Sequence, residues 1–416
     1  MSLALYAAGT ATKKSTEIKR KINYDQLLSQ LNERSSCDDW VKYKREHPEC
    51  KSKLFIDSGA FTAHTKGKEV DVDDYIQYIN SIDDQVTTFA QVDHIPGVWG
   101  KPKTPEQLAE APKLSWENYL YMVDKVKSAK KLQPIFHQGE DFKYLIQMVN
   151  YKYDENVLDK SIVGQPIDYI GLSCNKELST TEWVDWFTKC FKIIHESSNP
   201  NVKTHAFGMT SLKVLEQFPF TSADSTSWIR SASFGNVILN YGSVYVSSWN
   251  KNDPSYILNQ SKAIQEEVAK KCNKYNMSFF ELLDEATTED RDVVLEKITS
   301  LANKTKKALG KVNIVFEIPE YTNKYIIDIK EELTKNVKIA VDEYLETCAD
   351  ESLKEVVQNT YEIFNVKLNG GEFNGKKEKG INAPAGIRAD FNLYSLKEWV
   401  DNYKYIGTTY YENDLW

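Results

Sequence analysis

Short apolar runs alternate with helix-like stretches through the first 260 residues, and this alternation restricts the folds that the chain can adopt. The runs expected to form strands cover residues 3–7, 54–57, 88–93, 134–138, 169–173, 204–208 and 221–225, with 237–240 as an eighth candidate. Strands that alternate with helices form a parallel sheet. Seven or eight such units in a segment of this length predict an α/β fold, a (β/α)8 barrel of the TIM type, rather than an open sheet.

The intervening stretches predict helices over residues 24–32, 72–81, 115–129, 142–151, 181–195 and 211–217. Thr181 and Ser211 stand where a hydroxyl can cap the free amides of a helix start. Beyond residue 260 the pattern changes, and we expect helices over 258–309 and 322–364, a strand over 312–319 and a loop over 370–375. The sequence thus predicts a catalytic domain over 1–260 and a mostly helical C-terminal domain over 261–416, a candidate for DNA binding.

The composition is that of an ordinary globular protein, with 41% hydrophobic and 27% charged residues. No stretch of 18 apolar residues occurs, so we expect no membrane-spanning helix and no membrane partner. The first eight residues lack the basic and apolar regions of a secretory signal, which predicts a cytoplasmic protein. The six cysteines form no close pair, which argues against a structural zinc site and against a disulfide framework.

The net charge of −8 argues against a protein that is held on nucleic acid by bulk charge alone. The sequence nevertheless contains clusters of basic residues, and each is either a solvated surface or a contact for a phosphate backbone. The clusters are Lys13, Lys14, Lys19, Arg20 and Lys21; Lys304, Lys306, Lys307 and Lys311; and Lys376, Lys377 and Lys379.

Polar side chains follow the predicted strands at the same end each time. The residues at the C-terminal ends of the apolar runs are Asp57, Asp93, Gln138, Ser173 and Asp224. Barrel enzymes build their active sites on this face. Chemistry at an anomeric carbon requires at least two carboxylates at such a face. One attacks the carbon or stabilises the transition state, and the other transfers a proton.

Each carboxylate has a functional interpretation and a structural alternative. Asp57 could act as a general acid/base at a ring nitrogen, or it could simply fix the Asp-Ser-Gly turn. Asp93 could accept two hydrogen bonds from a guanine-like N–H and amine, or it could end a strand. Asp224 could attack C1′ and form a covalent glycosyl intermediate, or it could lie on the surface at a capped helix start.

The uncharged candidate residues and the histidines also allow both a functional and a structural interpretation. The amide of Gln138 could read a carbonyl oxygen, and Gly171 could let a backbone N–H approach the same edge of a base, or both could be packing details. Three histidines beside strand ends, at positions 94, 137 and 205, raise the question of a metal. Barrel hydrolases with a divalent metal carry paired histidines on an early strand, and none occurs here, so we expect no metal and no cofactor.

Taken in order, these motifs resemble those of the tRNA-guanine transglycosylase superfamily over residues 50–240. The matching elements are Asp57-Ser58-Gly59-Ala60-Phe61, Val92-Asp93, His137-Gln138-Gly139, Ile170-Gly171-Leu172, His205-Ala206-Phe207-Gly208 and Asp224-Ser225. The resemblance implies that Asp57 is the general acid/base and that Asp224 is the nucleophile. The base contacts that it implies are Ser58, Asp93, Gln138, Gly171 and Leu172.

One departure from the family pattern bears on the nucleic acid. Members that act on tRNA carry a C-x-C-x-x-C…H zinc subdomain after the barrel, and this chain has no such cysteines. In this respect it is more similar to the DNA 7-deazaguanine transglycosylases of phages and genomic islands. That branch implies exchange of guanine in DNA for a free 7-deazaguanine base such as 7-cyano-7-deazaguanine, with tRNA as the alternative partner.

Such an enzyme must flip its guanine out of a duplex. The aromatic candidates to sandwich the flipped base are Phe61, Phe89, Phe207 and Trp228, although most aromatic residues are core residues. The candidates for contacts to the phosphate backbone are Arg230, Lys376 and Lys377. The competing functions are a guanine glycosylase with water as acceptor, a metal-dependent barrel hydrolase and a non-catalytic binding subunit.

Overall fold

A computed structural model describes residues 2–11, 13–98, 100–209, 211–240, 242–246, 253–277, 279, 282, 291–320, 326–378, 381 and 386–407. By its internal contacts the chain divides into two units. Met1–Ser227 and Leu396–Trp416 form the first unit, and Trp228–Ser395 forms the second. The boundary expected at residue 260 falls inside the second unit.

The first unit is built on an α/β barrel, as predicted. Its strands form a nine-stranded sheet in the order β5-β4-β3-β2-β1-β9-β8-β7-β6, with parallel pairing throughout. The strands are β1 (Ala4–Ala8), β2 (Gln26–Ser29), β3 (Leu54–Asp57), β4 (Thr88–Ala90), β5 (Leu132–Gln133), β6 (Ile135–His137), β7 (Tyr169–Ser173), β8 (Lys203–Phe207) and β9 (Ser222–Ser225).

Pro134 brings the two ends of this sheet together. β5 and β6 stand at opposite ends of the strand order, yet they are consecutive in the chain and flank Pro134. The Pro134 carbonyl accepts a hydrogen bond from the Gly171 N–H in β7 at 2.8 Å. Since β5 pairs with β4 and β6 pairs with β7, this interrupted strand nearly closes the sheet into a (β/α)8 barrel.

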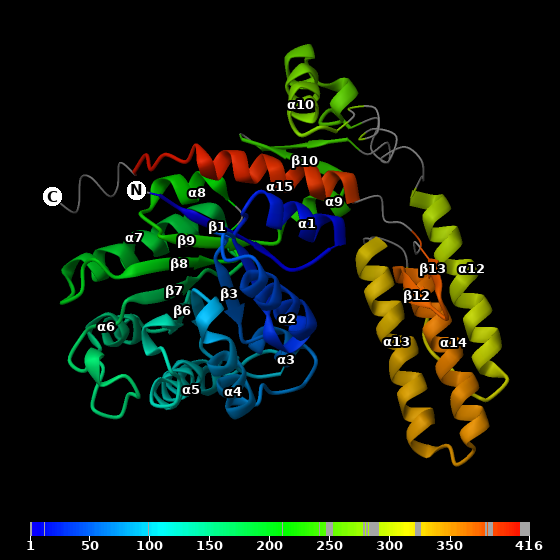
Figure 1. Ribbon diagram of the computed structural model, residues 1–416, viewed down its shortest axis with the longest axis horizontal. Coiled ribbons are helices and arrows are strands. Elements are labelled where there is room, and N and C mark those ends of the chain that lie inside the picture. The colour runs from blue at the N-terminus through cyan, green and yellow to red at the C-terminus, as the bar shows by residue number, and fades with distance from the viewer. Residues whose placement is uncertain are drawn as a thin grey trace. The chain divides into compact units, whose positions relative to one another are not determined.

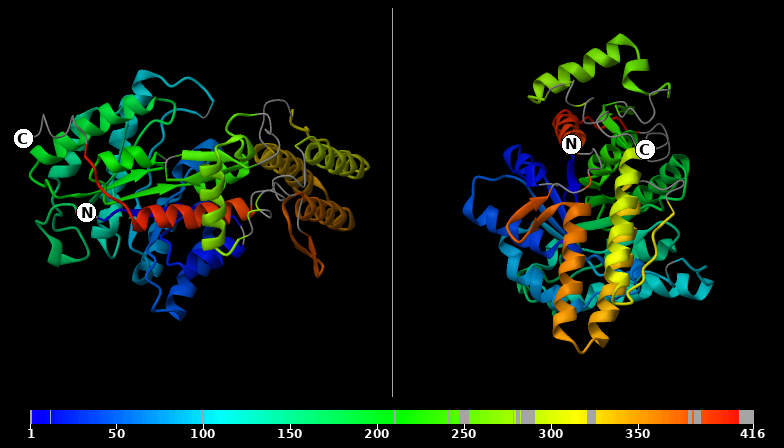
Figure 2. Two further views of the ribbon diagram at one scale, coloured as in Figure 1. Left: turned by 90° about the horizontal axis from the view of Figure 1, so that it is seen from above. Right: turned by 90° about the vertical axis from the view of Figure 1, so that its right-hand side faces the viewer.

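Helices follow the strands and lie around the outside of the barrel (Figure 1), as the two further views in Figure 2 also show. They are α1 (Lys13–Lys21), α2 (Gln30–Glu46), α3 (Ala60–Thr65), α4 (Val72–Ile82), α5 (Pro105–Val123), α6 (Phe142–Asn150), α7 (Thr180–Glu196) and α8 (Leu212–Gln217). The cap predicted at Ser211 is confirmed, because its side chain accepts from the Val214 N–H. No helix in the described ranges is both long enough and apolar enough to cross a membrane.

Two of the elements expected for the barrel are wrong. The helix expected over 24–32 is interrupted by β2, in which Gln26 pairs with Ala7 on one side and with Leu54 on the other. β2 escaped detection because it carries only two apolar residues and begins with a buried glutamine, whose Nε2 donates to the Ala7 carbonyl at 2.6 Å. The eighth strand expected at 237–240 belongs to the second unit, so β2 supplies the missing barrel strand.

Alternate residues of each strand point into the barrel, and an apolar layer fills it. Tyr6, Phe55 and Ala90 belong to this buried cluster, and Phe207 at the end of β8 packs against it. The ring of Phe207 lies 5.7 Å from the Phe55 ring and 4.4 Å from the ring of His205. Because side chains alternate with a period of two, the residue two positions after Phe55 faces the open end of the barrel, and that residue is Asp57.

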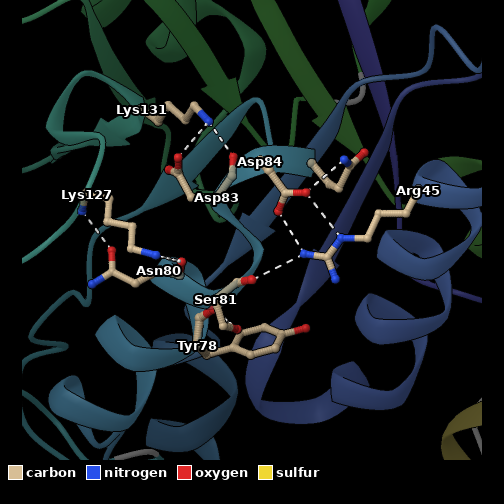
Figure 3. Close-up of polar contacts among 9 residues, drawn as sticks. Arg45, Tyr78, Asn80, Ser81, Asp83, Asp84, Lys127 and Lys131 are labelled. Carbon is tan, nitrogen blue, oxygen red and sulfur yellow. Dashed lines mark hydrogen bonds and ion pairs between the residues drawn. The ribbon is translucent and has the colours of Figure 1, made fainter. Parts of the chain in front are cut away.

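At the opposite end of the barrel, the segments that lead into β4 and β5 carry a polar network (Figure 3). Arg45 donates to the Asp84 carboxylate through Nε at 3.2 Å and through Nη2 at 2.8 Å. Lys131 pairs with Asp83 at 3.4 Å. Residues at the N-terminal ends of barrel strands serve stability rather than catalysis, so this network is expected to be structural.

Replacing Arg45 by glutamine tests how much that network contributes to the free energy of unfolding. The hydrogen-bonded Arg45 guanidinium lowers the pKa of the Asp84 carboxyl to about 2. Both side chains are about half exposed, so we expect Arg45→Gln to return the Asp84 pKa towards its ordinary value and to change the free energy of unfolding by less than about 1 kcal/mol. Carboxyl titration by NMR and urea unfolding measure the two quantities. A loss of several kcal/mol would contradict the expectation.

The second unit contains a small antiparallel hairpin and a helical bundle. β10 (Asn236–Leu239) and β11 (Gly242–Tyr245) share a core with the 3-10 helix η5 (Ile257–Asn259) and with α10 (Lys262–Lys274). The helices α12 (Arg291–Gly310), α13 (Ile326–Thr347) and α14 (Glu351–Asn369) lie side by side around a second core (Figure 1). The helical character expected beyond residue 260 is thereby confirmed.

Two smaller expectations in this unit are wrong. Residues 312–319 form no regular strand, and Ile314 and Phe316 are instead buried in the core of the bundle, which accounts for the apolar alternation of the segment. Residues 370–375 are more than a loop, because β12 (Gly371–Phe373) pairs with β13 (Lys376–Glu378) as a hairpin.

Two members of the first basic cluster are held within the barrel unit, whereas Lys13, Lys14 and Lys21 are exposed. Lys19 is fully buried on α1, where its Nζ donates to the Gly9 carbonyl at 3.1 Å, and burial lowers its pKa to about 7. Arg20 pairs with Asp39 at 2.6 Å, and its guanidinium lies 4.2 Å from the centre of the Tyr43 ring. The Arg20 contacts join α1 to α2, and the Lys19 contact joins α1 to the residue that follows β1, so neither side chain is available to a phosphate backbone.

Candidate active site

The candidate site lies at the C-terminal ends of the barrel strands. Asp57 is the last residue of β3, Asp224 lies in β9, and Asp93 follows β4 by three residues. In a parallel barrel these ends meet at one face. Repulsion from both Asp224 and Asp93 contributes to the pKa of Asp57, so each of these two carboxylates lies within electrostatic reach of Asp57.

Asp224 is buried, with 7% of its surface exposed, and one of its oxygens is held by two donors. Oδ1 accepts from the Gly208 N–H at 2.6 Å and lies 3.2 Å from Nε2 of His205. No described residue hydrogen-bonds to Oδ2. The carboxylate is therefore oriented by one oxygen while the other is left for a ligand, which is the arrangement that a carboxylate nucleophile needs.

A chain of polar side chains inside the barrel supports Asp224. His205 is fully buried and contacts Asp224 through Nε2 and Ser222 Oγ through Nδ1, the latter at 2.6 Å. Ser222 Oγ in turn lies 2.5 Å from the hydroxyl of Tyr169. Each ring nitrogen of His205 thus has a fixed partner, so the imidazole is held in one orientation beneath the carboxylate.

The Asp57 carboxyl accepts a hydrogen bond within a turn and has a raised pKa. Its Oδ2 accepts from the Gly59 N–H at 3.0 Å in the predicted turn, where Gly59 adopts a φ of +81°. Burial raises the pKa of the Asp57 carboxyl to about 7, and repulsion from Asp224 and Asp93 adds to the rise against the opposing Gly59 hydrogen bond. A carboxyl with a pKa near neutrality can both give and take a proton at physiological pH, as a general acid/base must.

Asp93 belongs to a cluster of charged groups at the mouth. Its Oδ1 accepts from Nε2 of Gln91 at 2.6 Å, and its Oδ2 lies 3.3 Å from Nε2 of His137 at the end of β6. Nδ1 of His137 lies 3.1 Å from the Glu140 carboxylate. Burial alone would lower the pKa of His137, but the two carboxylates overcome it and raise this pKa to about 10.

The other expected base contacts lie near the mouth but are already engaged. Gln138 donates through Nε2 to the Glu182 carbonyl at 3.2 Å, and its Oε1 accepts from the Asn175 N–H at 3.0 Å. Ser58 is buried, and its Oγ accepts from the Ala60 N–H. A direct reading of a base by the Gln138 side chain would require these two hydrogen bonds to break.

Gly171 and Leu172 have structural roles in β7. The Gly171 N–H donates to the Pro134 carbonyl between β5 and β6. A Cβ atom at Gly171 would lie 2.4 Å from Cε2 of Phe207, so only glycine leaves room for that ring. Leu172 is fully buried, and by the alternation of β7 its side chain points away from the barrel interior.

We expect Gly171→Ala to destabilise the protein by about 1–3 kcal/mol, because the added methyl group must displace the Phe207 ring. Urea unfolding measures the loss. Gly310→Ala is a suitable control, since a Cβ atom there meets nothing within 4 Å. Equal stability of the Gly171→Ala variant and the parent would show that Phe207 has room to move.

The aromatic candidates for base stacking and the cationic candidates for phosphate contacts lie in different parts of the structure. Phe207 lines the barrel beside His205, whereas Phe89 and Trp228 are core residues with 1% and 0% of their surface exposed. Phe61 on α3 is 59% exposed. The cationic candidates lie on the second unit: Arg230 is exposed on α9 (Ser227–Ser233), Lys376 is exposed on β13, and Lys377 lies on β13 with its side chain outside the described part.

Several residues of the site were not predicted in their present roles. They are Gln91, Glu140, Tyr169, the backbone N–H of Gly208, and Ser222. Ser222 could have been found, because it precedes Asp224 by two and therefore shares its face of β9. Glu140 and Gly208 act through turns, whose geometry the sequence does not reveal.

Among the described residues, no group of three or more histidine, cysteine, aspartate or glutamate side chains could hold a metal ion. The six cysteines are free thiols. A search against models of known protein families and a search of curated proteins find no match to this chain.

Proposed function

We propose that this protein is a base-exchange transglycosylase that replaces guanine in DNA by a 7-deazaguanine through a covalent intermediate on Asp224. The observation that carries the proposal is the pairing of two carboxylates in different environments at one barrel mouth. Asp224 offers an oriented oxygen, and Asp57 has a pKa of about 7. Two carboxyl groups in such different environments are typical of a nucleophile paired with a general acid/base.

In the proposed first step, Oδ2 of Asp224 attacks C1′ of the flipped nucleotide. The bond from C1′ to N9 breaks, its electron pair goes to the base, and the protonated Asp57 carboxyl gives the departing guanine a proton. In the second step the incoming base returns a proton to Asp57 and attacks C1′, and the ester to Asp224 breaks. Two displacements at C1′ retain the anomeric configuration.

The choice of nucleic acid rests on the family resemblance and on the missing zinc cysteines, and the alternative substrate is tRNA. The net charge of −8 favours an enzyme whose contacts with a phosphate backbone are local rather than spread over its surface. An exposed lysine on the β12–β13 hairpin, Lys376, is a candidate for such a contact. Lys19 and Arg20 are not, because both are held within the barrel unit.

The experiment that tests the proposal is the exchange of labelled guanine into double-stranded DNA, single-stranded DNA and tRNA, compared side by side. Guanine-for-guanine exchange does not require the natural incoming base to be known. Label that enters DNA and is lost with Asp224→Ala supports the proposal. Label that enters only tRNA keeps the chemistry and overturns the choice of DNA. Release of guanine without incorporation would indicate a glycosylase that uses water, and no label and no release would reject both.

A further inference from the structure

Both ring nitrogens of His137 have a partner at the mouth, and the proposed chemistry does not use this side chain. Its Nε2 lies 3.3 Å from Oδ2 of Asp93 and its Nδ1 lies 3.1 Å from Oε1 of Glu140. Its backbone N–H also donates to Oε2 of Glu140 at 3.0 Å. One carboxylate therefore fixes both the backbone and the ring of His137, while the opposite ring nitrogen points at Asp93.

Both ring nitrogens of His137 face oxygens of carboxylates, which in their ionised form only accept hydrogen bonds. A neutral imidazole has one donor and one acceptor nitrogen, so one of the two contacts would then set a lone pair against a carboxylate oxygen. An imidazolium donates at both nitrogens and satisfies both contacts. The geometry thus requires the charged form, in a row that runs from Glu140 through His137 to Asp93.

We propose that His137 is a positioning residue that, as an imidazolium anchored by Glu140, fixes the orientation of the Asp93 carboxylate so that it can receive the N–H groups of the exchanged base. This inference rests on the proposed function and extends it. Gln91 completes the arrangement, because its Nε2 donates to Oδ1 of Asp93 at 2.6 Å. Each oxygen of Asp93 then has one protein donor and keeps a lone pair for the ligand.

The charge of the row explains why a histidine suits this place. The charges of Asp93 and Asp224 both act on Asp57, so several carboxyl groups lie together at the mouth. A cation beside Asp93 offsets the repulsion between these groups and donates to one Asp93 oxygen, which keeps a second lone pair to accept from a base N–H. Among the described residues, the charged groups that contact the imidazole are Asp93 and Glu140.

The decisive variants are His137→Gln, which keeps a donor but removes the charge, and His94→Gln as the matched control. His94 is exposed on the neighbouring loop, where its backbone N–H donates to Oγ of Ser115. In guanine exchange we expect His137→Gln to raise KM for the free base by about tenfold or more and to leave kcat within about threefold. Both constants should be measured at pH 6 and at pH 8. His94→Gln should match the parent at both pH values.

An unchanged KM at both pH values in His137→Gln would overturn the inference. A second measurement does not depend on turnover: the ¹⁵N shifts of the His137 ring, followed by NMR, should show both nitrogens protonated up to at least pH 9 and a lower titration midpoint in Glu140→Gln. An imidazole that titrates near pH 6.5 would also overturn it. Absence of exchange in the parent, with the ring still protonated at pH 9, would instead reject the proposed function while leaving the charged row intact.

Discussion

Asp224→Asn is expected to abolish base exchange, with a loss of about 10⁴-fold or more in kcat/KM. The amide is nearly isosteric with the carboxylate, and its oxygen can keep the hydrogen bonds from Gly208 and His205. It lacks the negative oxygen that attacks C1′, so binding should persist while the covalent step is lost. Exchange of labelled guanine measures the rate, and a denaturing gel of enzyme with labelled DNA measures the covalent adduct.

Asp185→Asn is the matched control for this variant, because Asp185 is an exposed carboxylate on α7 rather than on a barrel strand. It should retain the parent rate and the parent yield of adduct. An Asp224→Asn variant that keeps more than a tenth of the parent rate would reject Asp224 as the nucleophile. Loss of exchange together with loss of the folded state would point to a structural role, so circular dichroism accompanies both variants.

Asp57→Asn is expected to lower kcat/KM by about 10²- to 10⁴-fold, the usual range for loss of a general acid/base. The parent pH profile should bend near pH 7, where burial and the neighbouring carboxylates place the Asp57 pKa, and the bend should vanish in the variant. Rates of guanine exchange from pH 5 to pH 9 measure both effects. A parent profile that is flat across pH 7 would contradict the role given to Asp57.

The same substitution has a second expected effect that does not depend on function. The folded-state pKa of Asp57, about 7, is raised above the ordinary value of 3.8, so its contribution to stability is present in full below pH 3.8 and is lost as the pH rises through 7. The asparagine side chain of the variant has no proton to lose. Asp57→Asn should therefore be more stable than the parent at pH 8, by at most about 4 kcal/mol, with the difference shrinking towards pH 4. Urea unfolding at the two pH values measures it, and a difference that is independent of pH would contradict the raised pKa.

The fold was predictable where strand and turn signals were strong. The runs at 54–57 and 169–173 coincide with β3 and β7, because several consecutive apolar residues are followed by polar residues at the barrel mouth. β2 was missed because a buried glutamine replaces an apolar residue at its start. The strand expected at 312–319 failed for a related reason, since apolar alternation marks burial but not the partner against which a segment is buried.

The position of the candidate site in the fold was predictable, whereas the contacts of its residues were not. Asp57 and Asp224 were identified from their motifs, and the structure places them at one end of one barrel. The raised pKa of Asp57 and the orientation of Asp224 were not accessible from the sequence, because they depend on the burial of Asp57 and on the N–H of Gly208. Gln138 illustrates the converse: its motif suggested an amide free to read a base, whereas its side chain spans the Asn175 and Glu182 backbones.

The end of the described chain returns to the barrel after the second unit. Ile406 and Gly407 donate their N–H groups to the Glu216 carbonyl of α8, and the hydroxyl of Tyr403 donates to the Leu215 carbonyl. The barrel unit is therefore discontinuous in sequence, and on the ribosome its last segment is made only after residues 228–395. At ordinary rates of synthesis that delay is roughly 10 to 30 s, during which α8 lacks these partners and the nascent barrel is open to chaperones.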